Sequence, residues 1–225
     1  MHIEPGLVAE GKIWLSVATA AGAGAYGLKL AWEDIKERGA LSLVARAAIT
    51  SSLVFCFFEV FPHYPVGVSE VHFILGTTLF LLFGSAAAAI GLALGLLAQG
   101  MFFAPADLPQ YFMNVTTLLV PLYGIHALAH RIIDPGTPYV DLKYRQVLAL
   151  SATYQAGIVA WVAFWALYGQ GFGAENLQSL VMFGGAYLLV IILEPLVDLA
   201  VLAGAKALRF LRGSPLVVQR LYHPV

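Results

Sequence analysis

Residues 178–205, QSLVMFGGAYLLVIILEPLVDLAVLAGA, form a long apolar run that decides the class of fold. A helix needs about 20 mostly apolar residues to cross the hydrocarbon core of a bilayer. The rest of the chain agrees with this segment, because 60% of its 225 residues are hydrophobic and 11% are charged. A soluble domain has about 25% charged residues. Together with a mean hydropathy of +0.82, the run predicts an all-α polytopic membrane protein.

Six further apolar segments precede this run. They lie at roughly 13–31, 42–61, 70–83, 86–103, 110–130 and 147–168. The segment 70–83 is short for a full crossing, so we expect seven transmembrane helices of which the third is short. We expect one transmembrane domain over 1–225, with a metal-binding N-terminal segment at 1–12 and a basic cytoplasmic tail at 206–225.

The basic residues predict how the chain is oriented. Every Lys and Arg except Lys12 falls in or beside the segments that follow the first, fifth and seventh spans. Cytoplasmic loops carry an excess of Lys and Arg, which places the N-terminus outside and the C-terminus in the cytoplasm. We expect residues 32–39 to form a charged inner loop and residues 61–67 to form a rigid outer loop.

The first six residues, Met1-His2-Ile3-Glu4-Pro5-Gly6, form a chelating end on the outer side. The α-amine of Met1, the deprotonated amide of His2 and its imidazole can close two chelate rings around one ion in one plane. Planar nitrogen donors suit Ni(II) and Cu(II), and Co(II) less strictly. No cleavable signal peptide is evident before the first span, so we expect this end to be retained.

Two outer histidines are candidates for the fourth nitrogen ligand. His72 lies at the outer start of the third span, and His63 lies in the loop before it. Glu70, close to both, is expected either to support the ligands or to carry a charge at the rim. The residues alone leave open which histidine completes the square.

The terminal Met1-His2-Ile3, with Phe61-Pro62 and His72, resembles the metal-binding membrane component of cobalt and nickel energy-coupling-factor transporters, the CbiM/NikM type. Those chains begin Met-His-Ile and carry a Phe-Pro … Ser-Gly-His stretch before the third of seven spans. The resemblance extends over roughly residues 1–130. It departs from the family pattern at Val71, which stands where the family has Gly.

The resemblance implies that Met1, His2 and His72 bind the transported ion, Ni(II) or Co(II). In a later span Asn114 matches the family pattern and Thr117 replaces an Asn. Asn114 is expected either to support the site by a hydrogen bond or to join neighbouring helices.

The resemblance further implies a substrate-specific component of an ATP-driven transporter in the plasma (inner) membrane of a prokaryote. Its partners would be a membrane coupling subunit, ATPase subunits and a small accessory membrane subunit. The sequence contains no GxxxxGK[ST], HExxH or GxSxG motif, so we expect no ATPase or hydrolase activity in this chain. We expect no organic cofactor and, without a long basic face, no nucleic-acid partner.

Glu194 and Asp198 lie one helical turn apart in the last apolar run. Acids at membrane depth are expected to have a function. We expect Arg46 to form an intramembrane charge cluster with them, with a proton relay as the alternative. If the two acids couple transport to an ion gradient, the chain is instead a secondary small-solute carrier that needs neither an ATPase nor His2.

Overall fold

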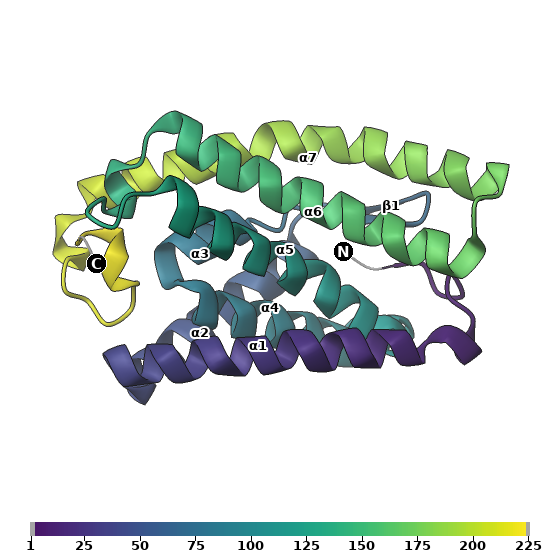
Figure 1. Ribbon diagram of the computed structural model, residues 1–225, viewed down its shortest axis with the longest axis horizontal. Helices are drawn as coiled ribbons and strands as arrows, with labels where there is room; N and C mark the ends of the chain where they lie inside the picture. Colours follow the sequence, from purple (N-terminus) through teal and green to yellow (C-terminus); the bar gives the residue numbers. More distant parts are fainter. Residues whose placement is uncertain (1–2, 224–225) are drawn as a thin grey trace.

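The computed structural model describes residues 3–223, and most of this chain is helical. The described residues contain seven α-helices that run along one long axis (Figure 1). These are α1 (Trp14–Arg38), α2 (Ala40–Phe55), α3 (Gly76–Phe83), α4 (Ser85–Phe102), α5 (Tyr111–Ile132), α6 (Tyr144–Gln170) and α7 (Ala174–Ala207). A π-helical turn, Cys56–Val60, extends α2, and short 3-10 turns lie at Glu10–Lys12, Pro105–Gln110, Tyr139–Asp141, Arg209–Leu211 and Gln219–Leu221.

Five segments of the described chain are long and apolar enough to cross a membrane. They are Ala40–Val60, Ser85–Phe102, Pro105–Ile132, Tyr144–Gln170 and Ala174–Ala207. The prediction of a helical, polytopic membrane protein is therefore confirmed. Of the two remaining helices, α3 has eight residues, while α1 is rich in Ala and Gly and has a charged end.

Helix α1 continues through the stretch 32–39 that we expected to form a loop. The helix ends at Arg38, and Gly39 with φ of 82° separates it from α2. Glu and Lys are good helix formers, so the charges in this stretch do not interrupt the helix. The loop prediction was wrong, and the extra turns bring Asp34 beside α2.

A β-hairpin stands where we expected a loop followed by the start of a helix. Strands β1 (Tyr64–Val66) and β2 (Ser69–Val71) pair antiparallel, with Pro65 opposite Glu70. At the turn, Gly67 has φ of +62°, and a Cβ there would lie 2.1 Å from the carbonyl oxygen of Ser179 on α7. The turn therefore needs glycine both for its backbone conformation and for its close approach to α7.

The predicted third span begins as a strand and becomes helical only at Gly76. Leu75 precedes it with a left-handed backbone, φ 53°. The β-branched residues Val66 and Val71 suit the two strands, and the pairing of β2 with β1 keeps residues 70 and 71 out of the helix. His72 thus lies on non-helical backbone between β2 and α3.

Three small residues at four-residue spacing on α4, Ala87, Gly91 and Gly95, are buried inside the bundle. A Cβ on Gly91 would lie 2.2 Å from Thr50 Oγ1, and one on Gly95 would lie 2.7 Å from Val54. These contacts hold α4 directly against α2, as small residues permit.

Candidate metal centre

The N-terminal segment enters the bundle and pairs with the hairpin. Ile3 forms an antiparallel bridge with Ser69, and the Glu4 amide donates to the Val68 carbonyl at 3.2 Å. Ile3 is completely buried and packs in a cluster with Val8, Met113 and Trp165. The described chain is therefore fixed in place up to residue 3.

Asn114 holds the backbone of Ile3. The Ile3 amide donates to Asn114 Oδ1 at 2.9 Å, and Asn114 is 1% exposed on α5. Asn114 was expected either to support the site by a hydrogen bond or to join neighbouring helices. The contact with Ile3 is a hydrogen bond to the N-terminal segment. Because an unsatisfied buried amide costs about 1–3 kcal/mol, the bond strongly favours this position of the chain end.

For the metal site predicted from the sequence, changing Asn114 to Ala is expected to lower the affinity by about tenfold or more, because it leaves the buried Ile3 amide without its acceptor. Asn114→Asp keeps an acceptor oxygen and should retain most of the affinity. Thr117→Ala is the matched control, since its hydroxyl bonds Met113 in the same helix. Metal titration by calorimetry measures all three, and equal affinity of Asn114→Ala and the control would contradict this role.

His72 directly follows β2, the strand that Ile3 joins through its bridge to Ser69. Its side chain is buried, and its Nε2 lies 2.9 Å from Glu70 Oε2. Phe58 meets the imidazole edge-on, with ring centroids 5.2 Å apart. The carboxylate and the aromatic ring together fix the orientation of this imidazole.

The imidazole of His63 stacks on that of His72. The two rings are nearly parallel, at 13°, with centroids 4.9 Å apart. His63 is half-buried, and its Nδ1 lies 3.2 Å from the Phe61 carbonyl oxygen. The structure therefore brings both candidate histidines together with Glu70.

The surroundings of this centre are acidic. Burial, followed by the carboxylates of Glu70 and Asp107, raises the pKa of Glu4. Neighbouring carboxylates raise the local concentration of cations.

The predicted ligands Met1 and His2 fall outside the described residues. Among residues 3–223, no group of three or more His, Cys, Asp or Glu side chains is placed to hold a metal ion. A complete nitrogen site in this region therefore depends on the first two residues.

The predicted pairing of Arg46 with Glu194 and Asp198 does not form. The Arg46 guanidinium is fully buried, forms an ion pair with Asp34, and donates to the Phe83 carbonyl at 2.5 Å and to Ser42 Oγ at 3.3 Å. The pairing was wrong because α1 extends further than predicted and supplies Asp34.

Glu194 and Asp198 instead face α3 and α6. Glu194 Oε1 accepts the amide protons of Ile74 and Leu75 at 2.6 and 3.1 Å. Gln155 on α6 donates to its other oxygen. Sequence reasoning missed these donors, although a buried glutamine in an apolar helix was a signal for one of them.

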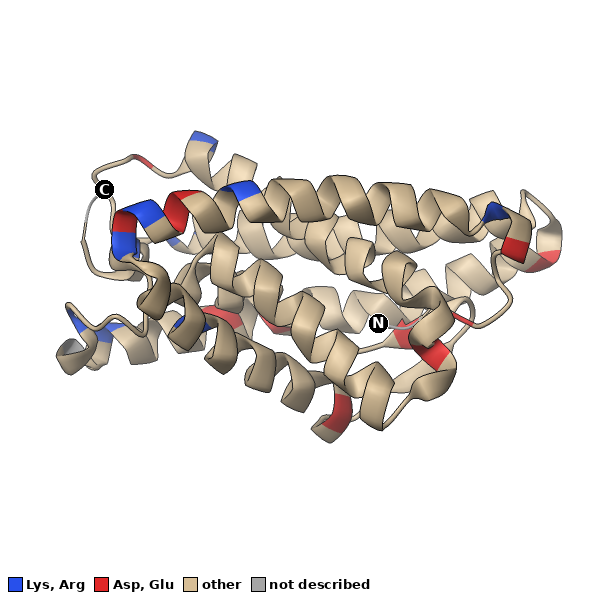
Figure 2. Ribbon diagram, turned by 90° about the horizontal axis from the view of Figure 1, so that it is seen from below, with Lys and Arg blue, Asp and Glu red and all other residues tan. Residues whose placement is uncertain are grey.

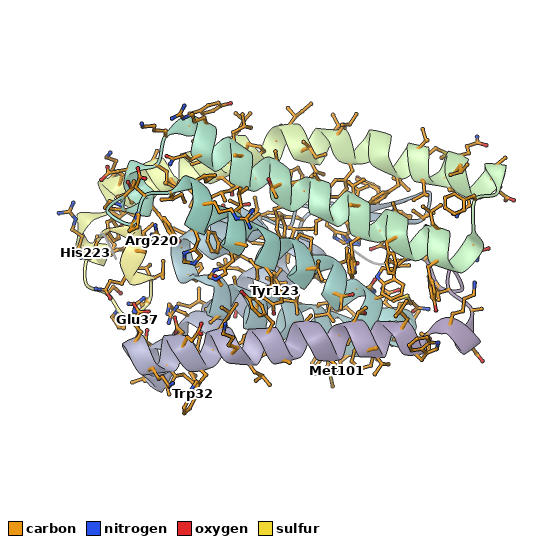
Figure 3. The ribbon with its side chains drawn as sticks, in the orientation of Figure 1. Trp32, Glu37, Met101, Tyr123, Arg220 and His223 are labelled. Atoms are coloured by element: carbon orange, nitrogen blue, oxygen red, sulfur yellow. The ribbon has the colours of Figure 1, made fainter. Side chains whose placement is uncertain are left out.

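His126 and His130 lie toward the other end of the bundle. His126 Nδ1 lies 2.6 Å from Ser85 Oγ, and the two imidazoles meet edge-to-face. They line a cavity of about 280 Å³ together with Glu37 and Arg220. Glu37 and Arg220 are seen at the end that carries the C-terminal segment (Figure 3).

Residues 2–210 match the model of a protein family described as the cobalt uptake substrate-specific transmembrane region, CbiM. This chain belongs to the CbiM family. The resemblance found in the sequence is thereby confirmed, and it extends well beyond residue 130. As a member of the CbiM family, the chain is a membrane component of transition-metal uptake.

Two solved structures share the fold of this CbiM-family chain. One is described as a transition metal transporter; it is 21% identical, the match covers 92% of this chain and 93% of that one, and the TM-score is 0.66. The other is described as a truncated transition metal transporter; it is 22% identical, with coverage of 92% and 99% and a TM-score of 0.62. No curated protein sequence matches the chain at a significant level.

Proposed function

We propose that this CbiM-family chain captures Ni(II) or Co(II) at the outer face of a prokaryotic plasma membrane and passes the ion inward. The ligands are the amine of Met1, the amide and imidazole of His2, and the imidazole of His72. The N-terminal segment 1–12 thus serves as the metal-binding part of one transmembrane domain over 1–225.

The observation that carries this proposal is the position of Ile3. From Glu4 to Ile3 the chain runs alongside Val68 and then Ser69, which is toward Glu70 and His72. The segment is held by Asn114 and by burial of the Ile3 side chain. This direction of residues 4 and 3 supports a site that combines the two preceding residues with His72.

Glu70 supports His72 as the fourth ligand. A metal-binding imidazole commonly donates its other ring N–H to a carboxylate, which fixes the tautomer and makes the ligand more basic. His72 Nε2 already lies 2.9 Å from Glu70 Oε2, so we assign Nδ1 to the metal. His63 would then act by stacking on the ligand.

The length of α1, the burial of the backbone before α3 and the position of the basic residues support seven crossings with the N-terminus outside. With a rise of 1.5 Å per residue, α1 is about 37 Å long, enough to cross a bilayer. The non-helical backbone before α3 is tolerated at membrane depth where protein surrounds it, and Ile74 and Leu75 are buried. Most Lys and Arg residues lie at the end of the bundle that carries the C-terminus (Figure 2), as an inner end with the basic tail 206–225 requires.

Transport by this chain requires partners in the proposed scheme. Because the sequence has no P-loop motif, ATP hydrolysis is assigned to separate ATPase subunits joined through a membrane coupling subunit. A planar four-nitrogen site favours Ni(II), whereas Co(II) is less strict about geometry. Competition between the two ions for the purified protein would decide the substrate.

Metal content of the purified protein tests this function. Protein with an authentic Met1 terminus is expected to retain about one Ni(II) or Co(II) per chain, and His2→Ala is expected to lose it, because the substitution removes the imidazole donor and one of the two chelate rings. His130→Ala, a histidine on α5 outside the proposed centre, is the control. Equal metal content in His2→Ala and the control would rule out the N-terminal site and favour the secondary carrier.

A further inference from the structure

Two acids of α7, Glu194 and Asp198, lie in a buried polar cluster beside the backbone that follows His72. Glu194 is 0% exposed and Asp198 is 1% exposed. Thr78 on α3 donates its hydroxyl proton to Asp198 Oδ1 at 2.5 Å. Glu194 is bonded to the backbone of Ile74 and Leu75, which directly follow the His72 segment.

No described basic side chain balances these acids. Neither carboxylate has a Lys, Arg or His within ion-pair distance among residues 3–223. The titratable groups that face Glu194 are Asp198 and the phenols of Tyr154 and Tyr187, which supply no positive charge. Two ionised carboxylates in contact with a low-dielectric interior repel each other and lose hydration, so the pair needs one positive charge.

The hydrogen bonds favour Glu194 as the ionised member. Both of its oxygens accept N–H groups, from Ile74, Leu75 and Gln155. The hydroxyl of Tyr187 donates to Gln155 Oε1 at 2.9 Å, which turns the amide NH₂ group toward Glu194. Such donors stabilise a carboxylate and would repel a metal cation at the same place.

Asp198 has the opposite surroundings. Among the described residues, Asp198 Oδ2 and Ser151 Oγ are both buried, and neither forms a well-aligned hydrogen bond. Ser151 on the facing helix α6 lies within hydrogen-bonding reach of the Asp198 carboxyl. A proton on Oδ2 would turn that oxygen into a donor and give Ser151 Oγ a proton to accept, which satisfies both atoms.

We propose that the Glu194–Asp198 pair is a proton-binding site that holds a single proton on Asp198 Oδ2. The remaining negative charge stays on Glu194, where it accepts hydrogen bonds from the amides of Ile74 and Leu75, shortly after His72 in the chain. Proton binding here does not depend on the metal ligands, so this proposal and the proposed function can fail separately.

Infrared spectroscopy of the purified protein tests the site, because a protonated carboxyl has a C=O stretch above the amide I band that shifts in D₂O. We expect this band in the wild type and in Glu194→Gln, and its loss in Asp198→Asn. Asp141→Asn is the control, since Asp141 is an exposed acid paired with Lys206. Loss of the band in Glu194→Gln alone, or no band in the wild type, would overturn the assignment.

Thermal stability gives a second test that remains informative if one variant folds poorly. Asp198→Asn resembles the protonated acid in shape and charge, so its Tm should stay within about 3 °C of the wild type. Glu194→Gln replaces one acceptor oxygen by a donor facing N–H groups, and its Tm should fall by about 5 °C or more. A stable Glu194→Gln together with a strongly destabilised Asp198→Asn would place the proton on Glu194 instead.

Discussion

One residue added ahead of Met1 is expected to lower the affinity for Ni(II) or Co(II) by about 100-fold or more. The addition turns the α-amine into an amide and moves the new amine away from the other donors. Removing an outer partner of a metal ligand already costs about 10–100-fold, and here a ligand itself is lost. The chain cannot shift to compensate, because Ile3 is held by Asn114 and by its bridge to Ser69.

The experiment compares two proteins that differ only in that residue. Proteolytic removal of a fusion partner can leave either an authentic Met1 or one extra glycine before it, and calorimetric titration measures both affinities. Without metal the two proteins should unfold at the same temperature, which separates loss of the ligand from loss of the fold. Equal affinities would show that metal binding does not require Met1 as the first residue, which contradicts the proposed site.

The helical architecture could be predicted from the sequence because it depends on local patterns. The run 178–205 lies within α7, and the span predicted at 110–130 corresponds to α5 (Tyr111–Ile132). The ends of the helices were harder to predict from the sequence, because charged residues alone do not end a helix. The extension of α1 to Arg38 follows from helix propensity and from Gly39, not from hydropathy.

The hairpin was missed because its stability comes from distant contacts. Its turn packs against Ser179 on α7, and its second strand pairs with Ile3, both far away in the sequence. Short apolar segments cannot be assigned to strand or helix from periodicity alone. The non-helical backbone before α3 therefore could not be predicted without the tertiary structure.

Only the side-chain chemistry of the candidate site could be predicted from the sequence. His72, His63 and Glu70 were named from residue type and topology, and the fold brings them together. The partners of Glu194 are mainly backbone amides, which every residue has and no motif marks. Arg46 was assigned to the wrong acids for a related reason, since Asp34 had been placed in a loop.

Replacing His72 by Ala is expected to lower metal affinity by about 100-fold, whereas His63→Ala should change it by less than about 5-fold. His72 is buried and held by Glu70, so its removal deletes a fixed ligand that water replaces poorly. His63 is half-buried and contributes a ring stack, and an aromatic pair is worth about 0.5–1.5 kcal/mol.

Two further variants separate a ligand from a neighbour that only positions it. Glu70→Gln should cost about 10–100-fold, because it removes the carboxylate that orients the His72 ring. Free imidazole should restore part of the binding of His72→Ala, since the substitution leaves a buried space shaped for that ring, and should not affect His63→Ala. If His63→Ala is the variant that loses metal and responds to imidazole, then His63 is the fourth ligand and the buried His72–Glu70 pair serves to hold it in place.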